Sequence, residues 1–384
     1  MKTRRIKTIL LFLSTMPFIG IYAQSIYYVS PHASSGGDGS PATPFHIIHE
    51  AVEKARKDKN CTTIYLREGE YILDTPLVLT SADGNDSKEL IIRNYPGEKA
   101  IISSGITLDL KWEKYKNGIM RAAVKGNPVM DMLIVNGDLR SMARYPDYDK
   151  TAVRFNGTSA LATAPERVKK WKNPEGGYFH AMHSHDWGDF HYRITGKNEK
   201  GELQLEGGWQ NNRPMGIHPE NRMVENIFEE LDAPGEWYYD KQEGWLYYYP
   251  LSDENINELV FETPQLKNLI EIAGTSSHPV KNITIEGIEL TQTIRTFMEH
   301  YEPLLRSDWT IYRGGAVIFR GTEKCTLRDC YIHHVGGNGV FFDKYNRNSA
   351  VTGSYLTSIG ASAICFVGDV AGVRSPSFRY GEFV

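Results

Sequence analysis

The stretch CTLRDCYIHHVGGNGVFF (325–342) is followed along the chain by SAVTGSYLTSIGASAICF (349–366), and both share one pattern. Six positions of the first stretch, all apolar or glycine, recur 24 residues later in the second. They are Leu327, Ile332, Val335, Gly336, Val340 and Phe342, repeated as Val351, Leu356, Ile359, Gly360, Ile364 and Phe366. A constant period of this length, carried by short apolar strands and small-residue turns, indicates a solenoid.

The period predicts an all-β fold, a right-handed parallel β-helix, in which alternate side chains of each strand point into the core. The residues expected to stack in the core are Val317, Phe319, Val340, Phe342, Ile364 and Phe366. Those expected to point outward are Ile318, Phe341 and Cys365, then Arg320, Asp343 and Val367, and on another strand Glu289, Tyr331 and Tyr355.

The rest of the chain divides into regions by rhythm and composition. Residues 24–107 predict an N-terminal capping helix and the first coils of the solenoid. The helix is expected from apolar residues at helical spacing, namely Ile47, Ile48, Ala51, Val52 and Ala55. Residues 108–263 lose the repeat and are rich in aromatic residues, which indicates an insertion or β-rich subdomain with a hairpin at 235–250. Coils resume over 264–384, with a second insertion at 294–313.

Residues 1–23 have the pattern of a secretory signal peptide. Four basic residues, Lys2, Arg4, Arg5 and Lys7, precede an apolar run that is too short for a membrane-spanning helix. We therefore expect an exported chain, periplasmic or extracellular, with no membrane span after cleavage of the signal. An uncleaved N-terminal anchor is the alternative.

Charge and cysteine content argue against several classes of protein, namely nucleic-acid binders and disulfide-stabilised scaffolds. Loss of the four basic residues of the signal takes the formal net charge from −4 to −8, and no basic stripe is present, so nucleic acid is not an expected partner. Four cysteines are too few for a disulfide scaffold in 384 residues. Cys325 and Cys330 occupy strand positions, and we interpret them as buried thiols rather than metal ligands. The sequence contains no P-loop and no dinucleotide-binding motif, and we expect no cofactor.

Asp343 and Asp369 are the candidate catalytic carboxylates of the coils. Asp343 lies in an outward row, either as a general acid or base facing a groove or as an ion-pair partner of Arg320, one coil below. Asp369 follows the last apolar strand, either at the edge of that groove or as an ordinary turn residue. Glycoside hydrolysis uses two carboxyl groups, about 5–5.5 Å apart for retention or about 6.5–9.5 Å apart for inversion. This pair is the candidate for such chemistry.

The stretch HSHDWGDFH (183–191) is dense in residue types that bind zinc, but its spacing matches no standard metal motif. We expect polar contacts or sugar binding there, through His185 and Trp187, and no metal. Core packing is the alternative role for the indole ring. Tyr331, Tyr355 and Arg320, on outward rows of the coils, are further candidates for substrate binding.

Several longer motifs resemble those of exported bacterial β-helix carbohydrate-active enzymes. They are YYVSP with GDGSPATPFHIIHEAV, VNGDLRSMARYP (135–146), HDWGDFHYRITG (185–196), EGGWQNNRP and NIFEELDAPGEWYYD (226–240). The opening motif is shared by many β-helix hydrolases and lyases. The later motifs resemble glycoside hydrolase family 141, which is associated with α-L-fucosidase and xylanase activities, and the layout is similar to that of family 120. The resemblance covers nearly all of the mature chain and implies a pectate-lyase-like β-helix that hydrolyses O-glycosyl bonds of poly- or oligosaccharides.

The resemblance also implies several further coils beyond RSPSFRYGEFV, where the catalytic carboxylates of such proteins are expected. Two expectations follow: a hydrolase that uses Asp343 and Asp369, or a truncated, inactive form whose true pair would lie beyond Val384. A non-catalytic glycan-binding β-helix would use the same groove and is the alternative function. A Ca²⁺-dependent polysaccharide lyase is the second alternative, and it would need clustered aspartates, which the coils lack in sequence.

Overall fold

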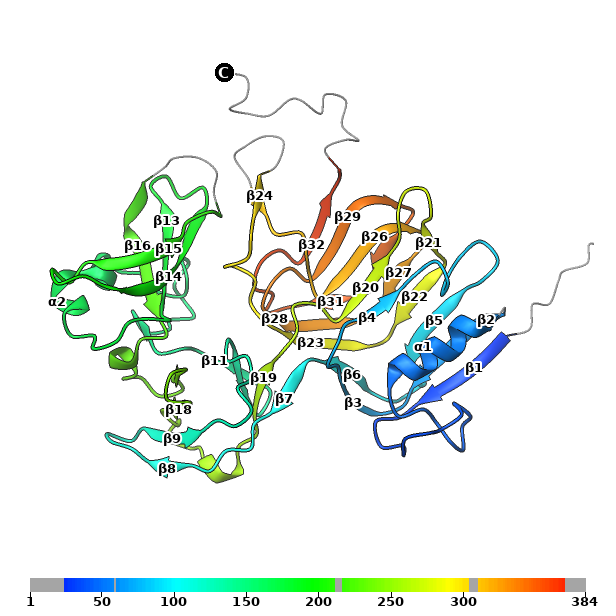
Figure 1. The fold of residues 1–384 in the computed structure, drawn as a ribbon, viewed down its shortest axis with the longest axis horizontal. Coiled ribbons are helices and arrows are strands. Elements are labelled where there is room, and N and C mark those ends of the chain that lie inside the picture. The colour runs from blue at the N-terminus through cyan, green and yellow to red at the C-terminus, as the bar shows by residue number, and fades with distance from the viewer. Residues whose placement is uncertain (1–23, 59, 211–215, 304–309, 370–384) are drawn as a thin grey trace, which may run out of the picture.

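The structure is a computed structural model that describes residues 24–58, 60–210, 216–303 and 310–369. Three parallel β-sheets form one side of the molecule (Figure 1). The expected signal peptide, 1–23, lies outside the described residues. The first sheet contains β1 (Gln24–Val29), β2 (Cys61–Leu66), β5 (Leu90–Asn94), β22 (Ile283–Glu286), β27 (Thr326–Arg328) and β30 (Ala350–Thr352). The second contains β3 (Gly69–Ile72), β6 (Ala100–Ser103), β23 (Glu289–Thr293), β28 (Tyr331–Val335) and β31 (Tyr355–Leu356). The third contains β4 (Leu77–Leu79), β20 (Ile270–Ala273), β26 (Val317–Glu323), β29 (Val340–Arg347) and β32 (Ile364–Val367), with β21 (Val280–Lys281) beside β26.

The chain visits these sheets in turn, through β26, β27 and β28 and then β29, β30 and β31, which is consistent with a β-helix. The register confirms the 24-residue period, since Val340 pairs with Ile364 and Leu327 pairs with Val351. Inside, the ring of Phe342 stacks on two others, with centroids 4.6 Å from Phe319 and 4.3 Å from Phe366. One 24-residue repeat of the sequence therefore corresponds to one coil of the structure.

Two details of the predicted stacking need correction. Ile318, Phe341 and Cys365 point away from the inner core cluster, yet they are buried, and Gly315, just before β26, lies against Phe341. Conversely, Phe366 stacks in the predicted row but is 71% exposed, since the described residues contain no strand beyond β32. Cys325 and Cys330 are buried in the core as free thiols, and burial raises the pKa of each to about 11.

The helix α1 (Ile48–Lys57) packs against β1 and β2 at the first coils (Figure 1). Its apolar stripe, formed by Ile48, Ala51, Val52 and Ala55, is buried as its helical spacing predicts. Ile47 does not belong to that stripe, because it precedes the helix and is 46% exposed. No helix among the described residues is long and apolar enough to cross a membrane.

Antiparallel sheets form the other side of the molecule (Figure 1). One contains β7 (Gly105–Thr107), β19 (Phe261–Pro264), β10 (Leu133–Val135) and β11 (Asp138–Arg140), and a second contains β8 (Glu113–Lys114), β9 (Met120–Ala123), β18 (Trp245–Tyr248) and β17 (Trp237–Asp240). A third contains β12 (Arg144–Tyr145), β16 (Ile217–Glu225), β13 (Tyr178–His183), β14 (Asp189–Lys197) and β15 (Leu203–Gly207). The short elements are α2 (Pro165–Val168), the 3-10 helices η1 (Ala160–Thr163), η2 (Phe228–Glu230) and η3 (Ile256–Glu258), and the pair β24 (Glu302–Pro303) and β25 (Thr310–Ile311).

The antiparallel region has its own hydrophobic clusters, separate from that of the coils. The aromatic hairpin predicted at 235–250 is present as β17 and β18, with a turn in which Asp240 accepts hydrogen bonds from two backbone N–H groups. The chain leaves the coils near β7 and returns through β19, and these two strands pair with each other. Both crossings lie beside the coils, so the antiparallel region is held next to the parallel sheets.

Candidate functional site

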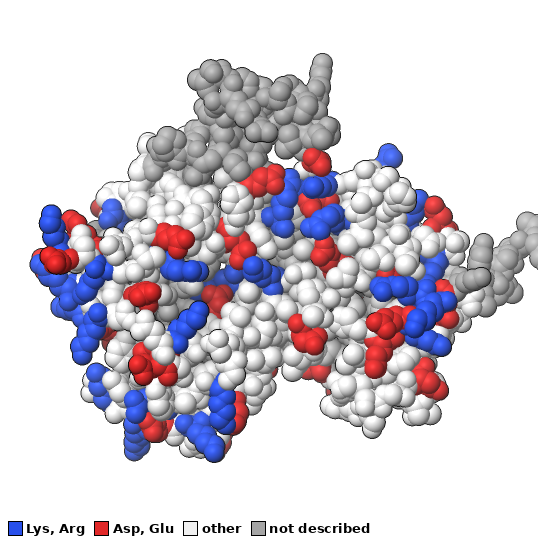
Figure 2. All heavy atoms as spheres, in the orientation of Figure 1, with Lys and Arg blue, Asp and Glu red and all other residues white. Residues whose placement is uncertain are grey.

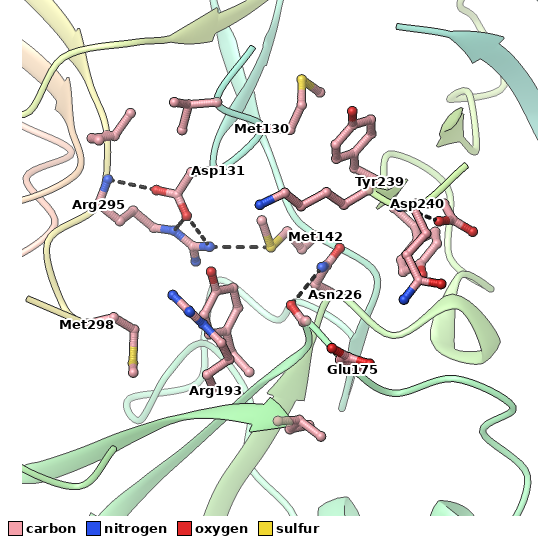
Figure 3. A pocket seen from close by; sticks show the side chains of 18 of the residues that line it. Met130, Asp131, Met142, Glu175, Arg193, Asn226, Tyr239, Asp240, Arg295 and Met298 are labelled. Atoms are coloured by element: carbon pink, nitrogen blue, oxygen red, sulfur yellow. Dashed lines mark hydrogen bonds and ion pairs between the residues drawn. The ribbon is translucent and has the colours of Figure 1, made fainter. Parts of the chain in front are cut away.

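A cavity of about 680 Å³ lies between the antiparallel region and the segment 294–299, which leads out of the coils after β23. Figure 3 shows side chains from several elements pointing into it. Its wall combines charged, aromatic and thioether groups, including Met130, Asp131, Met142, Glu175, Tyr178, Arg193, Glu206, Tyr239, Asp240, Lys241, Arg295, Phe297, Met298 and Glu299. The cavity is thus built from both kinds of region, and neither could form it alone.

Arg295 joins the two regions at this cavity. Its backbone N–H and its Nε and Nη2 groups donate to Asp131 at 2.8, 3.0 and 2.9 Å, and Nη1 donates to Glu225. Burial would lower the pKa of Arg295, but the two carboxylates outweigh it and raise that pKa. The cation therefore stays charged and fully paired, and it fixes the segment 294–299 against the antiparallel region.

Glu225 continues the network into a pair of histidines. His180 Nε2 lies 3.2 Å from Glu225 Oε1, and the Nδ1 atoms of His180 and His191 lie 2.6 Å apart. His191 Nε2 in turn lies 3.5 Å from Asp189 Oδ2. Burial lowers the pKa of His180, and Glu225 opposes that shift. A continuous polar chain thus runs from Arg295 at the cavity to Asp189.

Aromatic rings cover this network on the cavity side. The guanidinium carbon of Arg295 lies 5.3 Å from the ring centroid of Tyr178 and 4.8 Å from that of Phe297. The two rings meet edge to face at 5.1 Å, and burial raises the pKa of Tyr178. Such rings give a firm apolar surface beside hydrogen-bonding groups, an arrangement that suits a ligand with both apolar and hydroxyl faces.

The solvent side of the cavity carries exposed charges of both signs. Arg193 and Glu206 are direct cross-strand partners on β14 and β15, and both are exposed. Glu175 and Lys241 are exposed as well and line the cavity from other loops. These groups offer hydrogen-bond donors and acceptors to a polar ligand without the cost of breaking buried ion pairs.

The predicted residue Asp343 lies elsewhere, in the outward row of the coils. Its carboxylate forms the ion pair with Arg320 that was one of the two alternatives, at 2.7 Å. It forms a second ion pair with Arg313, at 2.6 Å. The side chain is only 3% exposed, because Arg313 comes in from the segment before β26 and covers it. Each carboxylate oxygen accepts from one guanidinium group, so Asp343 lies in the predicted row but does not face open solvent.

Asp369 follows β32, and its carboxylate lies 4.0 Å from Lys344 Nζ, with half of the side chain exposed. Arg313 reaches toward the same end of the sheet, since it donates to the carbonyl oxygens of Val367 and Gly368. Asp343 and Asp369 therefore belong to one edge of the third parallel sheet. Neither is part of the wall of the 680 Å³ cavity.

The remaining predicted residues form two separate groups. His185 and Trp187 meet in the turn between β13 and β14, with ring centroids 5.9 Å apart, and the indole is 61% exposed. Tyr331 and Tyr355 stack across adjacent coils at 5.6 Å and are 37% and 66% exposed. Among the described residues, no group of three or more histidine, cysteine, aspartate or glutamate side chains is arranged to hold a metal ion.

Sequence reasoning did not find Arg295, Asp131 or Glu225. Asp131 could have been noticed, since it is a single carboxylate within the apolar run VMDMLIV. A lone acid in such a run needs a partner when it is buried. The identity of that partner could not be deduced, because Arg295 is 164 residues away and lies in a segment without a regular repeat.

Comparisons with known proteins support the fold. No protein-family model matches the chain. An uncharacterized protein of Bacillus subtilis (strain 168), YwoF, is 34% identical over 88 residues, which are 22% of this chain and 17% of that protein. A solved structure described as a glycoside hydrolase superposes with a TM-score of 0.71 and 21% identity, over 86% of this chain and 65% of that one. A xylose complex of XylC covers 82% of this chain and 41% of its own, with 14% identity and a TM-score of 0.41, too low to carry an argument. The chain thus shares its fold with a glycoside hydrolase and spans slightly less than two thirds of that structure's length.

Proposed function

We propose that this chain is an exported, glycoside hydrolase-like protein, with a right-handed parallel β-helix, that binds poly- or oligosaccharide in the 680 Å³ cavity. The observation that supports this proposal most is the agreement in fold with a glycoside hydrolase over 86% of the chain. The unaligned remainder is shorter than the region 108–263 and shorter than the coils, so the agreement extends into both. The export is proposed from the pattern of residues 1–23.

The wall of the cavity suits a sugar chain. Sugar rings present C–H faces and hydroxyl edges, and Tyr178 and Phe297 supply ring surface next to the exposed polar groups of Arg193, Glu206 and Glu175. The largely buried ion pairs of Arg295 hold these rings in place before a ligand arrives. A preformed wall lowers the ordering cost of binding.

Asp343 and Asp369 are the carboxylates proposed for hydrolysis by the coils. Both lie outside the wall of the 680 Å³ cavity, which favours the second candidate function, a glycan-binding protein without turnover. Both oxygens of Asp343 already accept from guanidinium groups, and a general acid or nucleophile needs an oxygen free to reach the substrate.

The activity test uses aryl-glycosides with different sugars, together with the Asp343→Asn and Asp369→Asn variants and their double variant. Cleavage by the wild type that the double variant loses supports hydrolysis by this pair. Cleavage that persists in the double variant excludes the pair. Retention of a polysaccharide without any cleavage supports the binding protein, and new unsaturated ends with near-ultraviolet absorbance indicate a lyase instead.

A further inference from the structure

His180 and His191 face each other across the paired strands β13 and β14. Their two inner nitrogens, both Nδ1, lie 2.6 Å apart, and each outer Nε2 faces a carboxylate, of Glu225 at 3.2 Å and of Asp189 at 3.5 Å. The four ring nitrogens therefore form a line with an acceptor at each end. The number of protons on this line is limited by geometry.

Three protons satisfy every member of the line. Ionised carboxylates only accept hydrogen bonds, so each Nε2 must carry a proton to bond Glu225 or Asp189. Only one N–H fits between the inner nitrogens, since two opposed N–H groups would collide across 2.6 Å. Two neutral imidazoles carry two protons, and three give the pair a single positive charge. A fourth proton, added by acid, would push the rings apart.

The groups around the pair keep its end acceptors charged. The titratable and charged residues that face it from neighbouring elements are Glu225, Arg295, Asp189, Tyr178 and Tyr301. Burial would raise the pKa of Glu225, but Arg295 and His180 outweigh it and lower that pKa. Burial likewise would raise the pKa of Asp189, and His191 outweighs it. Both acceptors therefore remain ionised where histidine titrates.

The pair is in contact with the wall of the cavity. The ring of Phe297 lies 5.2 Å from that of His180 and 5.1 Å from that of His191. Glu225, the end acceptor on the His180 side, also accepts from Arg295. Rings that move apart would thus displace Phe297 and loosen Arg295, and both residues line the cavity.

We propose that His180 and His191 form a proton-controlled latch on the cavity. With three ring protons the pair holds Phe297 and Arg295 in the wall, and a fourth proton releases them and weakens glycan binding. The effect on glycan binding rests on the function proposed above, whereas the proton limit of the pair does not.

The latch itself is tested on the free, full-length protein. Unfolded histidines take up protons below about pH 6.5, whereas the folded pair resists the fourth, so the folded state loses stability as the pH falls through that range. His191→Gln removes one of the two facing rings and is expected to flatten the fall of the melting temperature between about pH 7 and pH 5. His278→Gln, at an exposed surface turn, is the matched control and should follow the wild type.

Equal acid sensitivity of the wild type and His191→Gln would overturn the latch. Nitrogen-15 spectra of the wild-type imidazoles give an answer that does not depend on the variant folding. We expect the two rings to titrate as a coupled pair, and two independent single-site titrations would contradict the proposal.

The coupling to the cavity is tested with soluble xylan and other plant polysaccharides in affinity gels. We expect retention of the best-bound polysaccharide by the wild type to weaken by about tenfold between pH 7 and pH 5, and by much less in His191→Gln. Unchanged retention in a protein that shows the coupled titration would overturn the link to the cavity. Absence of binding at every pH would instead remove the proposed function, while the melting and spectral tests of the latch would stand.

Discussion

The parallel coils and the antiparallel region differ in what holds them together. The coils are stabilised by repetition, as when Phe342 stacks between Phe319 and Phe366. The antiparallel region meets the coils through largely buried charges, of which Arg295 with Asp131 and Glu225 is the centre. Repetition produces a regular scaffold, whereas an irregular charged contact produces a cavity. Function in this molecule is therefore expected where the repeat breaks.

The largest effect is expected from Arg295→Gln. The substitution leaves Asp131 and Glu225 without their cation, and breaking a buried ion pair by removing one partner costs about 3–5 kcal/mol. We expect that loss in the free energy of unfolding, measured with urea, together with loss of polysaccharide retention. A variant of normal stability would show that the charged contact does not hold the two regions together.

Removal of a core side chain within the coils should cost stability but leave the proposed glycan site intact. Phe342→Ala removes a buried ring and is expected to lower the free energy of unfolding by about 3–5 kcal/mol. Phe366→Ala, one coil further in the same row, is the control and should cost much less because Phe366 is 71% exposed. Similar losses at both positions would contradict the stacking order of the coils.

Glu236 is expected to make the stability of the antiparallel region fall as the pH rises. It is buried, and burial, with nearby Asp147 and Asp232, raises its pKa to about 8. The folded state thus holds a proton that the unfolded state releases near pH 4.5, so stability is present at low pH and is lost as the pH rises through about 8.

The corresponding variant is Glu236→Gln, which keeps the shape of the side chain without its charge. The wild type is expected to lose on the order of 2 kcal/mol between pH 6 and pH 9, and the variant much less of it. Denaturant unfolding at both pH values measures the difference. If the free energy of unfolding of the two proteins fell by the same amount between about pH 6 and pH 9, the loss would be assigned to another group.

The smallest effect is expected at the surface of the coils. Arg328 pairs with Glu286 across adjacent coils and is 47% exposed. Arg328→Gln should change the free energy of unfolding only slightly, since exposed ion pairs contribute little. It is the matched counterpart of Arg295→Gln. Equal losses of unfolding free energy in the two variants would show that the ion pairs of Arg295 contribute no more than an exposed one.

The coils were predictable because their register repeats. Six residue pairs, such as Val340 with Ile364, were enough to predict strands, spacing and parallel pairing. Burial of Phe341 was not predictable, since its side chain lies outside the inner core cluster that the alternation describes. Local periodicity describes the inside of a coil but does not describe what packs on its outer face.

The candidate site was predicted only in part for a similar reason. The ion pair between Asp343 and Arg320 follows from their shared row, while the second partner, Arg313, comes from an irregular segment. The HSHDWGDFH stretch was noticed for its composition, and its last residue, His191, does belong to the cavity network. Its partner His180 gave no signal, because it lies in an ordinary aromatic strand whose pairing the sequence does not reveal.

Filling the cavity tests whether a glycan binds between the two regions. Met298→Trp adds bulk to the wall (Figure 3), and Ser276→Trp adds the same side chain at an exposed turn of the coils as a control. The face shown in Figure 2 carries interspersed positive and negative side chains, so nonspecific retention is checked at two salt concentrations. We predict that Ser276→Trp retains polysaccharide as the wild type does and that Met298→Trp does not. Equal retention by both variants would assign glycan binding to another surface.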